Sequence, residues 1–137
     1  MSASTGPIYS QRKESDLQWY PILASTTINP GTLVSITSAG YAIPARSGTA
    51  SDMFVGVAYD GGNNSAGASG AINTRVQKTG SFLFTTVGAT QAWVGSAVYA
   101  SDDNDLTQTS TNNQLVGYVC EFLSATQVRV RIDLAAK

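Results

Sequence analysis

Residues 114–134 read Gln-Leu-Val-Gly-Tyr-Val-Cys-Glu-Phe-Leu-Ser-Ala-Thr-Gln-Val-Arg-Val-Arg-Ile-Asp-Leu, and this stretch decides the fold. From Val128 to Leu134, apolar residues alternate strictly with charged ones. Successive side chains of a strand point to opposite faces, so this alternation predicts a half-buried β-strand. The first half is apolar at nearly every position and carries Gly117 in its middle. Two such runs joined by a short polar break predict a β-hairpin.

A weaker copy of this hairpin occurs earlier in the chain. Phe54-Val-Gly-Val-Ala58 aligns with Leu115-Val-Gly-Tyr-Val119, and residues 71–78 parallel the strand at 128–133. A glycine inside a strand indicates a bulge, a bend or the close approach of another backbone. The ten residues Gly61–Gly70 link the strands of the first copy, against four residues, 123–126, in the second. The sequence therefore predicts one β-unit used twice as a partial repeat, with a flexible, exposed loop at 61–70.

Short β-branched and aromatic runs, separated by turn residues, fill the chain from residue 17 onward. Pro21 and Pro44 place their runs at sheet edges, because proline cannot donate to a strand ladder. The pattern gives about nine or ten short strands and little or no helix. We therefore predict an all-β fold, a small β-barrel or β-sandwich, as a single domain over residues 17–137.

Residues 1–16 have a different composition and are rich in Ser, Thr and Gly. Their large apolar residues after Met1 are Ile8 and Tyr9, and Arg12 and Lys13 follow as a basic pair. Such a segment cannot bury enough apolar surface to offset the entropy of ordering. It is predicted to be an extended N-terminal arm, either mobile or ordered on a neighbour, with Ile8 and Tyr9 as its natural anchors.

The composition excludes several classes of function. Charged residues make up only 12% of the 137 residues and the net charge is −1, so nothing attracts nucleic acid or an anionic membrane. A polar but weakly charged surface suits packing against other proteins. The chain has no histidine, which removes the commonest general base and transition-metal ligand. No apolar run approaches the ~20 residues of a membrane span, and neither a cofactor nor a metal is predicted.

Three clusters could carry chemistry, but each has a simpler interpretation. The acidic run Asp102–Asp105 could hold calcium, yet Asp and Asn are also the usual residues of a tight turn. The Gly61–Gly70 loop lacks the following helix and the lysine of a nucleotide cradle. The third cluster is a set of basic residues that could form a stripe: Arg75, Lys78, Arg129 and Arg131. Its simpler interpretation is pairing across strands with carboxylates: Asp60, Glu121 or Asp133.

The remaining reactive residues do not predict an enzyme. The single cysteine, Cys120, lies in an apolar run and is predicted to be a small buried hydrophobe. A nucleophile would need a base, and neither Ser-x-x-Lys nor Gly-x-Ser-x-Gly occurs. The aromatic residues that could line a sugar-binding face are Trp19, Tyr20, Trp93 and Tyr99. In a small β-domain such residues more often fill a core or an interface.

The order of the segments carries a resemblance. Phe54-Val-Gly-Val-Ala58, a small-residue loop and the alternating 71–78 strand come first. Val94-Gly-Ser-Ala-Val-Tyr99, Leu106-Thr107 and the closing hairpin at 115–132 follow. From about residue 31 to residue 134, this order resembles the small β-barrel capsid decoration (cement, head-stabilising) proteins of tailed bacteriophages.

The resemblance implies a β-tulip-like fold and a homotrimer on the outer surface of the virion capsid, made in the host cytoplasm. The N-terminal arm would lie across neighbouring subunits of the major capsid protein and clamp them together. The residues expected to bind the capsid are Ile8, Tyr9, Arg12, Lys13, Trp19 and Tyr20. The leading hypothesis is thus a structural virion protein and not an enzyme. The alternative is a carbohydrate-binding β-module on a virion or cell surface, using Trp19, Trp93 or the 61–70 loop.

Overall fold

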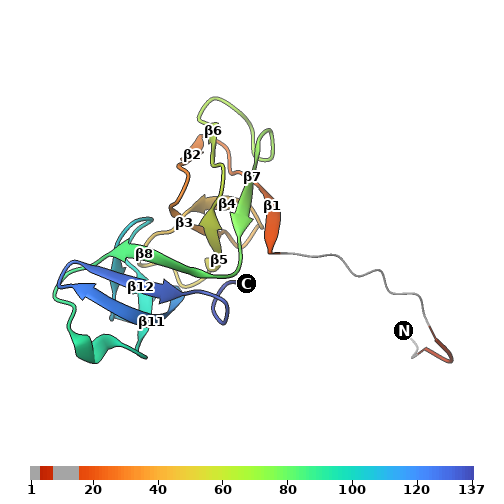
Figure 1. Ribbon diagram of the computed structural model, residues 1–137. Coiled ribbons are helices and arrows are strands. Elements are labelled where there is room, and N and C mark those ends of the chain that lie inside the picture. Colours follow the sequence, from red (N-terminus) through yellow and green to blue (C-terminus); the bar gives the residue numbers. More distant parts are fainter. Residues whose placement is uncertain (1–3, 8–15) are drawn as a thin grey trace.

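A computed structural model describes residues 4–7 and 16–137, so most of the predicted arm, residues 1–3 and 8–15, lies outside the described residues. The chain forms three antiparallel sheets, two of five strands and one of two strands (Figure 1). In sheet order, the first holds β1 (Leu17–Pro21), β7 (Asn73–Gln77), β5 (Met53–Ala58), β3 (Leu33–Ile36) and β4 (Ala42–Pro44). The second holds β10 (Leu106–Thr107), β9 (Ala97–Ala100), β11 (Leu115–Ser124), β12 (Gln127–Arg131) and β8 (Ser81–Thr85). The third pairs β2 (Thr26–Ile28) with β6 (Gly62–Asn64), and a 3-10 turn, η1, spans Gln91–Trp93.

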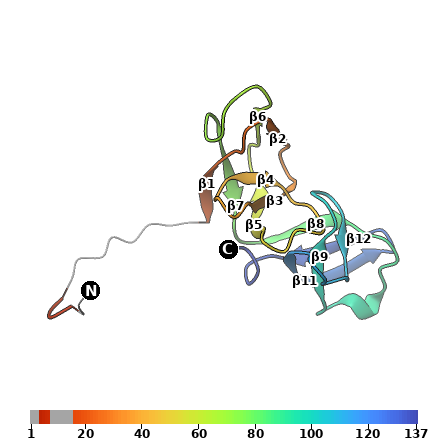
Figure 2. The same cartoon turned by 180° about the vertical axis from the view of Figure 1, so that it is seen from behind.

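The predicted all-β class is confirmed, with a sandwich-like arrangement of sheets. The two five-stranded sheets lie side by side in both views of the molecule (Figures 1 and 2). Pro21 and Pro44 lie on β1 and β4, the edge strands of the first sheet, as predicted. A closed barrel is not formed by the described strands. No helix among the residues that the structure describes is long and apolar enough to cross a membrane.

The two large sheets have the same topology. In each, the first strand in sequence lies at one edge, followed across the sheet by the fifth, fourth, second and third strands. The strand registers also match, since Val34 faces Gly56 across β3 and β5, and Val98 faces Gly117 across β9 and β11. We call residues 17–78 unit 1 and residues 81–134 unit 2. The repeat predicted for one hairpin therefore extends over all five strands of each unit.

The glycine in the middle of β5 and β11 allows a close contact between backbones. At Gly56, which has φ +145°, an added Cβ would lie 2.1 Å from the carbonyl oxygen of Gln77. At Gly117, an added Cβ would lie 2.1 Å from the carbonyl oxygen of Arg131. Both distances are far below van der Waals contact, so only glycine fits. This confirms the predicted close approach of a neighbouring strand.

Alternation along the strands produces two core clusters. The smaller cluster fills unit 1 and contains Ile22, Ile28, Val34, Ala42, Val55, Ala58 and Val76. The larger cluster fills unit 2 with residues such as Val98, Val116, Val128 and Val130, and it continues across the junction between the units. Unit 1 contributes Leu33, Ala45, Phe54 and Val57 to that larger cluster. The predicted core positions Val128, Val130 and Ile132 are all buried.

The main difference in chain length between the units is the connection from the fourth to the fifth strand. In unit 1 it contains β6, which pairs with β2 to form the small third sheet. The buried Asn64 amide nitrogen donates hydrogen bonds to the carbonyls of Ile22 (3.2 Å), Leu23 (3.1 Å) and Ala68 (2.9 Å). The prediction of a flexible loop at 61–70 is therefore wrong at β6, where one polar side chain ties the segment to the sheet, while most of the segment is exposed, as predicted.

Candidate binding face

An exposed aromatic cluster lies on the outer face of β1 and β7. Trp19 on β1 faces Arg75 on β7 across the strand pair. The Arg75 guanidinium carbon lies 5.1 Å from the centroid of the Trp19 ring and 5.0 Å from that of Tyr59. Trp19 and Tyr59 are each 53% exposed. We call Trp19, Tyr59, Arg75 and Asp60 the aromatic cluster.

Asp60 fixes the arginine between the two rings. Its carboxylate accepts hydrogen bonds from the Arg75 Nε (3.0 Å), the Arg75 backbone N–H (2.9 Å) and the Thr74 hydroxyl (3.3 Å). Partial burial raises the pKa of Asp60, but the hydrogen bonds and charge of Arg75 outweigh it and hold this pKa below its usual value. The cluster therefore presents two aromatic rings held around an internally neutralised ion pair.

Unit 2 keeps the ion pair and lacks the aromatic rings. Arg129, which matches Arg75, pairs with Glu121 at 3.4 Å. The position of Trp19 is occupied by Leu83, which faces Arg129 across β8 and β12. The position of Tyr59 is occupied by Cys120. Because unit 2 forms the same sheet without these rings, the fold itself does not require them.

Of the other residues predicted to bind the capsid, only Tyr20 is among the described residues. Ile8, Tyr9, Arg12 and Lys13 lie outside the described residues. Tyr20 lies on the opposite face of β1 from Trp19, partly buried against the core of unit 1. Its hydroxyl accepts a hydrogen bond from the Lys78 ammonium, which also lies 4.9 Å from its ring centroid.

Trp93 is not part of the aromatic cluster. It lies in η1 of unit 2, half-buried, and packs against the larger core cluster. Trp19 is the exposed tryptophan of β1, in unit 1. Trp93 thus contributes to the core of unit 2, whereas Trp19 lies on the surface of unit 1.

The charged residues follow the simpler interpretations made from the sequence. The predicted cross-strand pairing is confirmed for two arginines, which form the ion pairs Arg75–Asp60 and Arg129–Glu121. Arg131 instead pairs with Asp133, two residues further along the chain. The acidic run is a turn, since the Asp102 carboxylate accepts the backbone N–H groups of Asn104 (2.8 Å) and Asp105 (2.7 Å). Within residues 4–7 and 16–137, no group of His, Cys, Asp and Glu side chains could hold a metal ion.

Cys120 was predicted to be buried, and this prediction was wrong. The register of β11 against β12 shifts between Val119 and Glu121, so Cys120 sits in a bulge. Its side chain is exposed, with the sulfur 3.5 Å from the carbonyl oxygen of Arg129. A bulge reverses the expected alternation of faces, and an apolar run in sequence does not reveal where it occurs.

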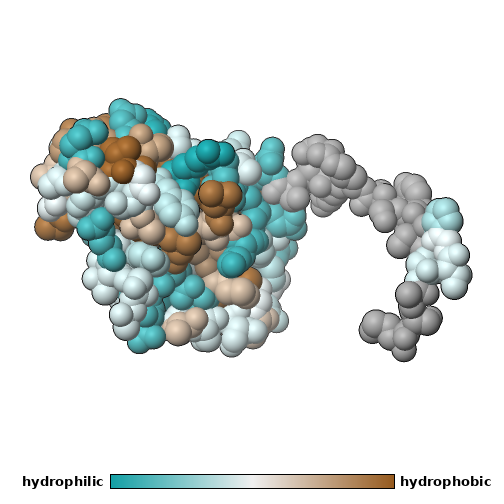
Figure 3. All heavy atoms as spheres, turned by 90° about the horizontal axis from the view of Figure 1, so that it is seen from below, coloured by the Kyte–Doolittle hydropathy of each residue, from teal (hydrophilic) through white to brown (hydrophobic). Residues whose placement is uncertain are grey.

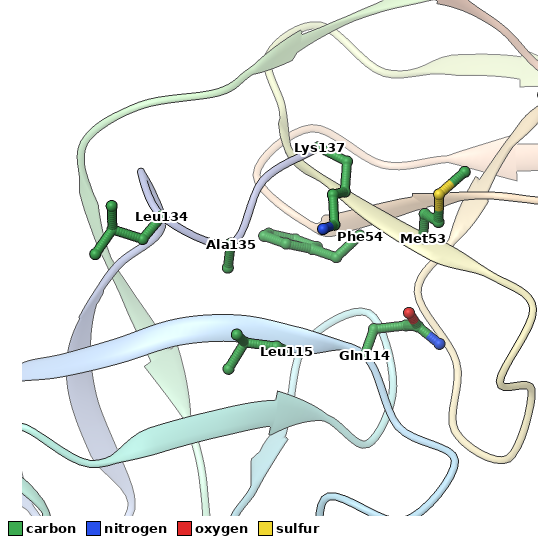
Figure 4. A pocket seen from close by; sticks show the side chains of 7 residues that line it. All are labelled: Met53, Phe54, Gln114, Leu115, Leu134, Ala135 and Lys137. Atoms are coloured by element: carbon green, nitrogen blue, oxygen red, sulfur yellow. The ribbon is translucent and has the colours of Figure 1, made fainter.

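A pocket of about 180 Å³ lies at the junction of the two units (Figure 4). Its lining residues are Met53, Phe54, Gln114, Leu115, Leu134, Ala135 and Lys137. The backbone N–H of Lys137 donates to the carbonyl of Phe54 at 2.9 Å, so the C-terminal tail forms one wall. The lining contains no pair of an acid and a base, and it therefore offers binding volume without catalytic groups.

The sequence model of the phage cement protein family matches residues 20–134. The chain belongs to this family. The match starts within β1 and ends just after β12, so it covers both units of the cement protein. A cement protein is a capsid-stabilising structural protein of the phage virion, which confirms the resemblance seen in the sequence. No curated protein and no solved structure matches the chain.

Sequence reasoning found Trp19 and the pairing of Arg75 with Asp60, but it missed Tyr59 and the approach of both rings to Arg75. Tyr59 lies at the end of β5, and its approach to Trp19 depends on β7 lying between β1 and β5. The alternation of residues 71–78 does place Arg75 on the outer face, and this signal was available from the sequence. The strand order that brings Trp19 and Tyr59 to either side of Arg75 could not be read from the sequence.

Proposed function

We propose that this cement protein binds the outer surface of the phage head as a homotrimer and stabilises contacts between major capsid protein subunits. The proposed contact consists of the arm residues Ile8, Tyr9, Arg12 and Lys13 together with Trp19. One observation carries the proposal: Trp19, on the strand that directly follows the arm, forms an exposed aromatic cluster with Tyr59, and unit 2 has no counterpart.

The chemistry of the aromatic cluster suits a protein partner. Trp, Tyr and Arg are the residues that most often dominate the energy of protein interfaces. Asp60 compensates the charge of Arg75, so burying the rings beside this ion pair costs less than burying them beside an unpaired arginine. Covering the rings would contribute about 25 cal/mol per Å² of apolar surface, before the entropy of association is counted.

Binding to undecorated, expanded capsids tests this proposal. Wild-type protein is expected to bind saturably and to raise the temperature at which the capsids rupture. Trp19→Ala is expected to weaken binding about 30-fold, the size of an interface hot spot. Leu83→Ala, the matched position of unit 2, is the control and should bind as wild type. Wild-type protein that neither binds saturably nor protects the capsids from heat would overturn the proposal.

The arm is tested separately from the aromatic cluster. Removing residues 1–15 leaves β1 intact, so the folded units should remain stable in thermal unfolding. If the arm clamps neighbouring capsid subunits, this truncation should lower capsid binding and lose the heat protection. Full protection by the truncated protein would show that the arm residues make no contribution.

A carbohydrate-binding module is the second candidate, favoured by one observation. Two exposed rings beside a carboxylate and a guanidinium are the groups that proteins use to stack on and hydrogen-bond a sugar. Silence on a glycan array, together with unchanged tryptophan fluorescence in the presence of sugars, would eliminate this candidate. A saturable, sugar-dependent change that Trp19→Ala abolishes would support it.

A further inference from the structure

The outer face of the second and fourth strands is buried in unit 1 and more exposed in unit 2. In unit 1, the outer faces of β3 and β5 carry Leu33, Phe54 and Val57. These side chains are only 0%, 2% and 2% exposed, and they join the core cluster that fills unit 2. The part of the outer face of unit 1 that β3 and β5 form is therefore buried, because unit 2 packs against it.

The matching face of unit 2 is covered much less in the described residues, where only Leu115 packs against the larger core cluster at the junction. Strand registers place Ala97, Leu115 and Tyr118 at the positions of Leu33, Phe54 and Val57. Ala97 and Leu115 are half-buried, and Tyr118 is 39% exposed. We call Ala97, Leu115 and Tyr118 the open face.

The open face continues into the junction pocket. Leu115 lines the junction pocket, and Leu134 on the rim of that pocket is 81% exposed (Figure 4). Seen from below, apolar side chains gather in patches over the folded units, among polar ones (Figure 3). Apolar positions that are buried in one unit and uncovered in the other indicate a surface made for a partner.

The way in which unit 2 covers unit 1 identifies the partner. The turn between β9 and β10 reaches unit 1, where the carbonyl of Asp103 accepts the backbone N–H of Leu33 at 2.8 Å. The matching turn of unit 1, between β3 and β4, has the same length, and Ala39 takes the place of Asp103. Ala39 is exposed. The β3–β4 turn of unit 1 thus matches the turn with which unit 2 contacts unit 1, but it is exposed. The open face of unit 2 likewise matches the face of unit 1 that this contact buries.

We infer that the open face binds the β3–β4 turn of a second copy of this chain, repeating between copies the packing of unit 2 on unit 1. Such a contact joins two different surfaces, so identical copies can continue it until they close a ring. The inference deepens the homotrimer of the proposed function, on which it rests, by naming the two surfaces in contact. It needs no capsid, so it can be tested on the free protein.

The first experiment measures the mass of the free protein by light scattering over a range of concentrations. Wild-type protein should be a closed oligomer. Tyr118→Asp places a charge on the open face without disturbing the core, and it should shift dissociation to at least about tenfold higher concentration. Leu83→Asp is the control, since Leu83 is 42% exposed on the outer face of β8, and its mass should be unchanged.

The second experiment tests which surfaces meet. In a Cys120→Ser background, Ala39→Cys and Tyr118→Cys proteins are mixed and oxidised. Head-to-tail packing predicts crosslinks between the two variants, and none when Leu83→Cys replaces Tyr118→Cys.

A monomeric wild-type protein without crosslinks, or Tyr118→Cys crosslinked only to itself, would overturn the inference. Failure of the proposed function has a different signature. An intact oligomer that does not bind capsids would contradict the proposed function but not this contact between copies.

Discussion

Units 1 and 2 form the same five-stranded sheet from sequences that share few residues, and their differences separate fold from function. Both place a glycine in the fourth strand, and both pair an arginine of the fifth strand with a carboxylate. Only unit 1 carries the exposed aromatic cluster and the β2–β6 ribbon. Only unit 2 leaves the outer face of its second and fourth strands open. The shared features build the sheet, and the unshared ones are the candidates for binding.

The largest effect is expected from the shared glycines. Gly56→Ala and Gly117→Ala each place a methyl group 2.1 Å from a carbonyl oxygen of the neighbouring strand. Backbone cannot yield as a flexible side chain does, so each substitution should cost about 3 kcal/mol or more of unfolding free energy. Denaturant titration measures this cost, and equal losses would confirm that the two positions are equivalent.

Gly88→Ala is the matched control for these substitutions. Gly88 also has a positive φ, +73°, but an added Cβ would meet nothing within 4 Å. Its cost should therefore be the conformational strain alone, about 1 kcal/mol. If Gly117→Ala lowered the free energy of unfolding no more than Gly88→Ala does, the close approach of β11 and β12 would be contradicted.

The second effect should be confined to unit 1. Asn64→Ala removes the three hydrogen bonds that tie the ribbon to residues 22, 23 and 68, and it leaves buried carbonyls without donors. A cost of about 2–3 kcal/mol is expected. Hydrogen exchange should rise in β2 and β6 and stay unchanged in unit 2.

Asn63→Ala is the control for Asn64→Ala. Asn63 is exposed, and within the described part of the chain its side-chain oxygen accepts hydrogen bonds from the Thr27 hydroxyl and the Ser65 backbone N–H. Its replacement should cost no more than about 0.5 kcal/mol. Uniform loss of protection in both units after Asn64→Ala would show that the ribbon is not a local feature.

The sequence predicted the strands of the molecule better than their arrangement. Alternation and turn residues located nearly every strand, and the two prolines correctly indicated edge positions, because these signals act within a few residues. One hairpin was recognised as repeated because Gly56 and Gly117 share a motif. The other three strands of the repeat were not recognised, since equal topology requires only apolar residues at matching positions.

Features that depend on one distant contact could not be predicted. The amide of Asn64 orders a segment whose glycine and serine content is typical of a flexible loop. The bulge in β11 exposes Cys120, although its neighbours in sequence are apolar. The aromatic cluster needed the strand order before Tyr59 could be joined to Trp19. In each case the deciding partner lies across a sheet and not along the chain.

A smaller effect on stability is expected from the aromatic cluster. Trp19→Ala removes a half-exposed ring and its contact with Arg75, which should cost about 1 kcal/mol. Leu83→Ala at the matched position of unit 2 should cost about as much, because Leu83 is similarly exposed. Thermal unfolding measures both. A loss above about 3 kcal/mol for Trp19→Ala alone would mean that the ring supports the fold, which would weaken the case for a binding role.

The smallest effect concerns the response of the two units to acid. The pKa values of Asp60 in unit 1 and Asp133 in unit 2 are both lowered. For Asp60, hydrogen bonds from Arg75 outweigh burial, and for Asp133 the first cause is the 2.6 Å hydrogen bond from the Gly80 backbone N–H. A lowered folded pKa adds stability that is present above the unfolded value of about 3.9 and is lost as the pH falls through the folded value. Asp60→Asn and Asp133→Asn should each flatten the loss of stability below about pH 4.

Asp103, in the turn of unit 2 that contacts unit 1, should respond in the opposite direction. Burial first, and then the charge of Asp102, raises the pKa of Asp103. Its folded form therefore binds a proton more readily than the unfolded chain, and it favours folding as the pH falls towards that raised value. Asp103→Asn should accordingly raise stability at neutral pH and steepen the loss in acid, measured by urea titrations between about pH 3 and 7. The pKa of Asp60 is lowered by hydrogen-bond donors, and that of Asp103 is raised by burial and a neighbouring negative charge. If Asp60→Asn and Asp103→Asn changed the pH dependence of stability in the same direction, this assignment would be contradicted.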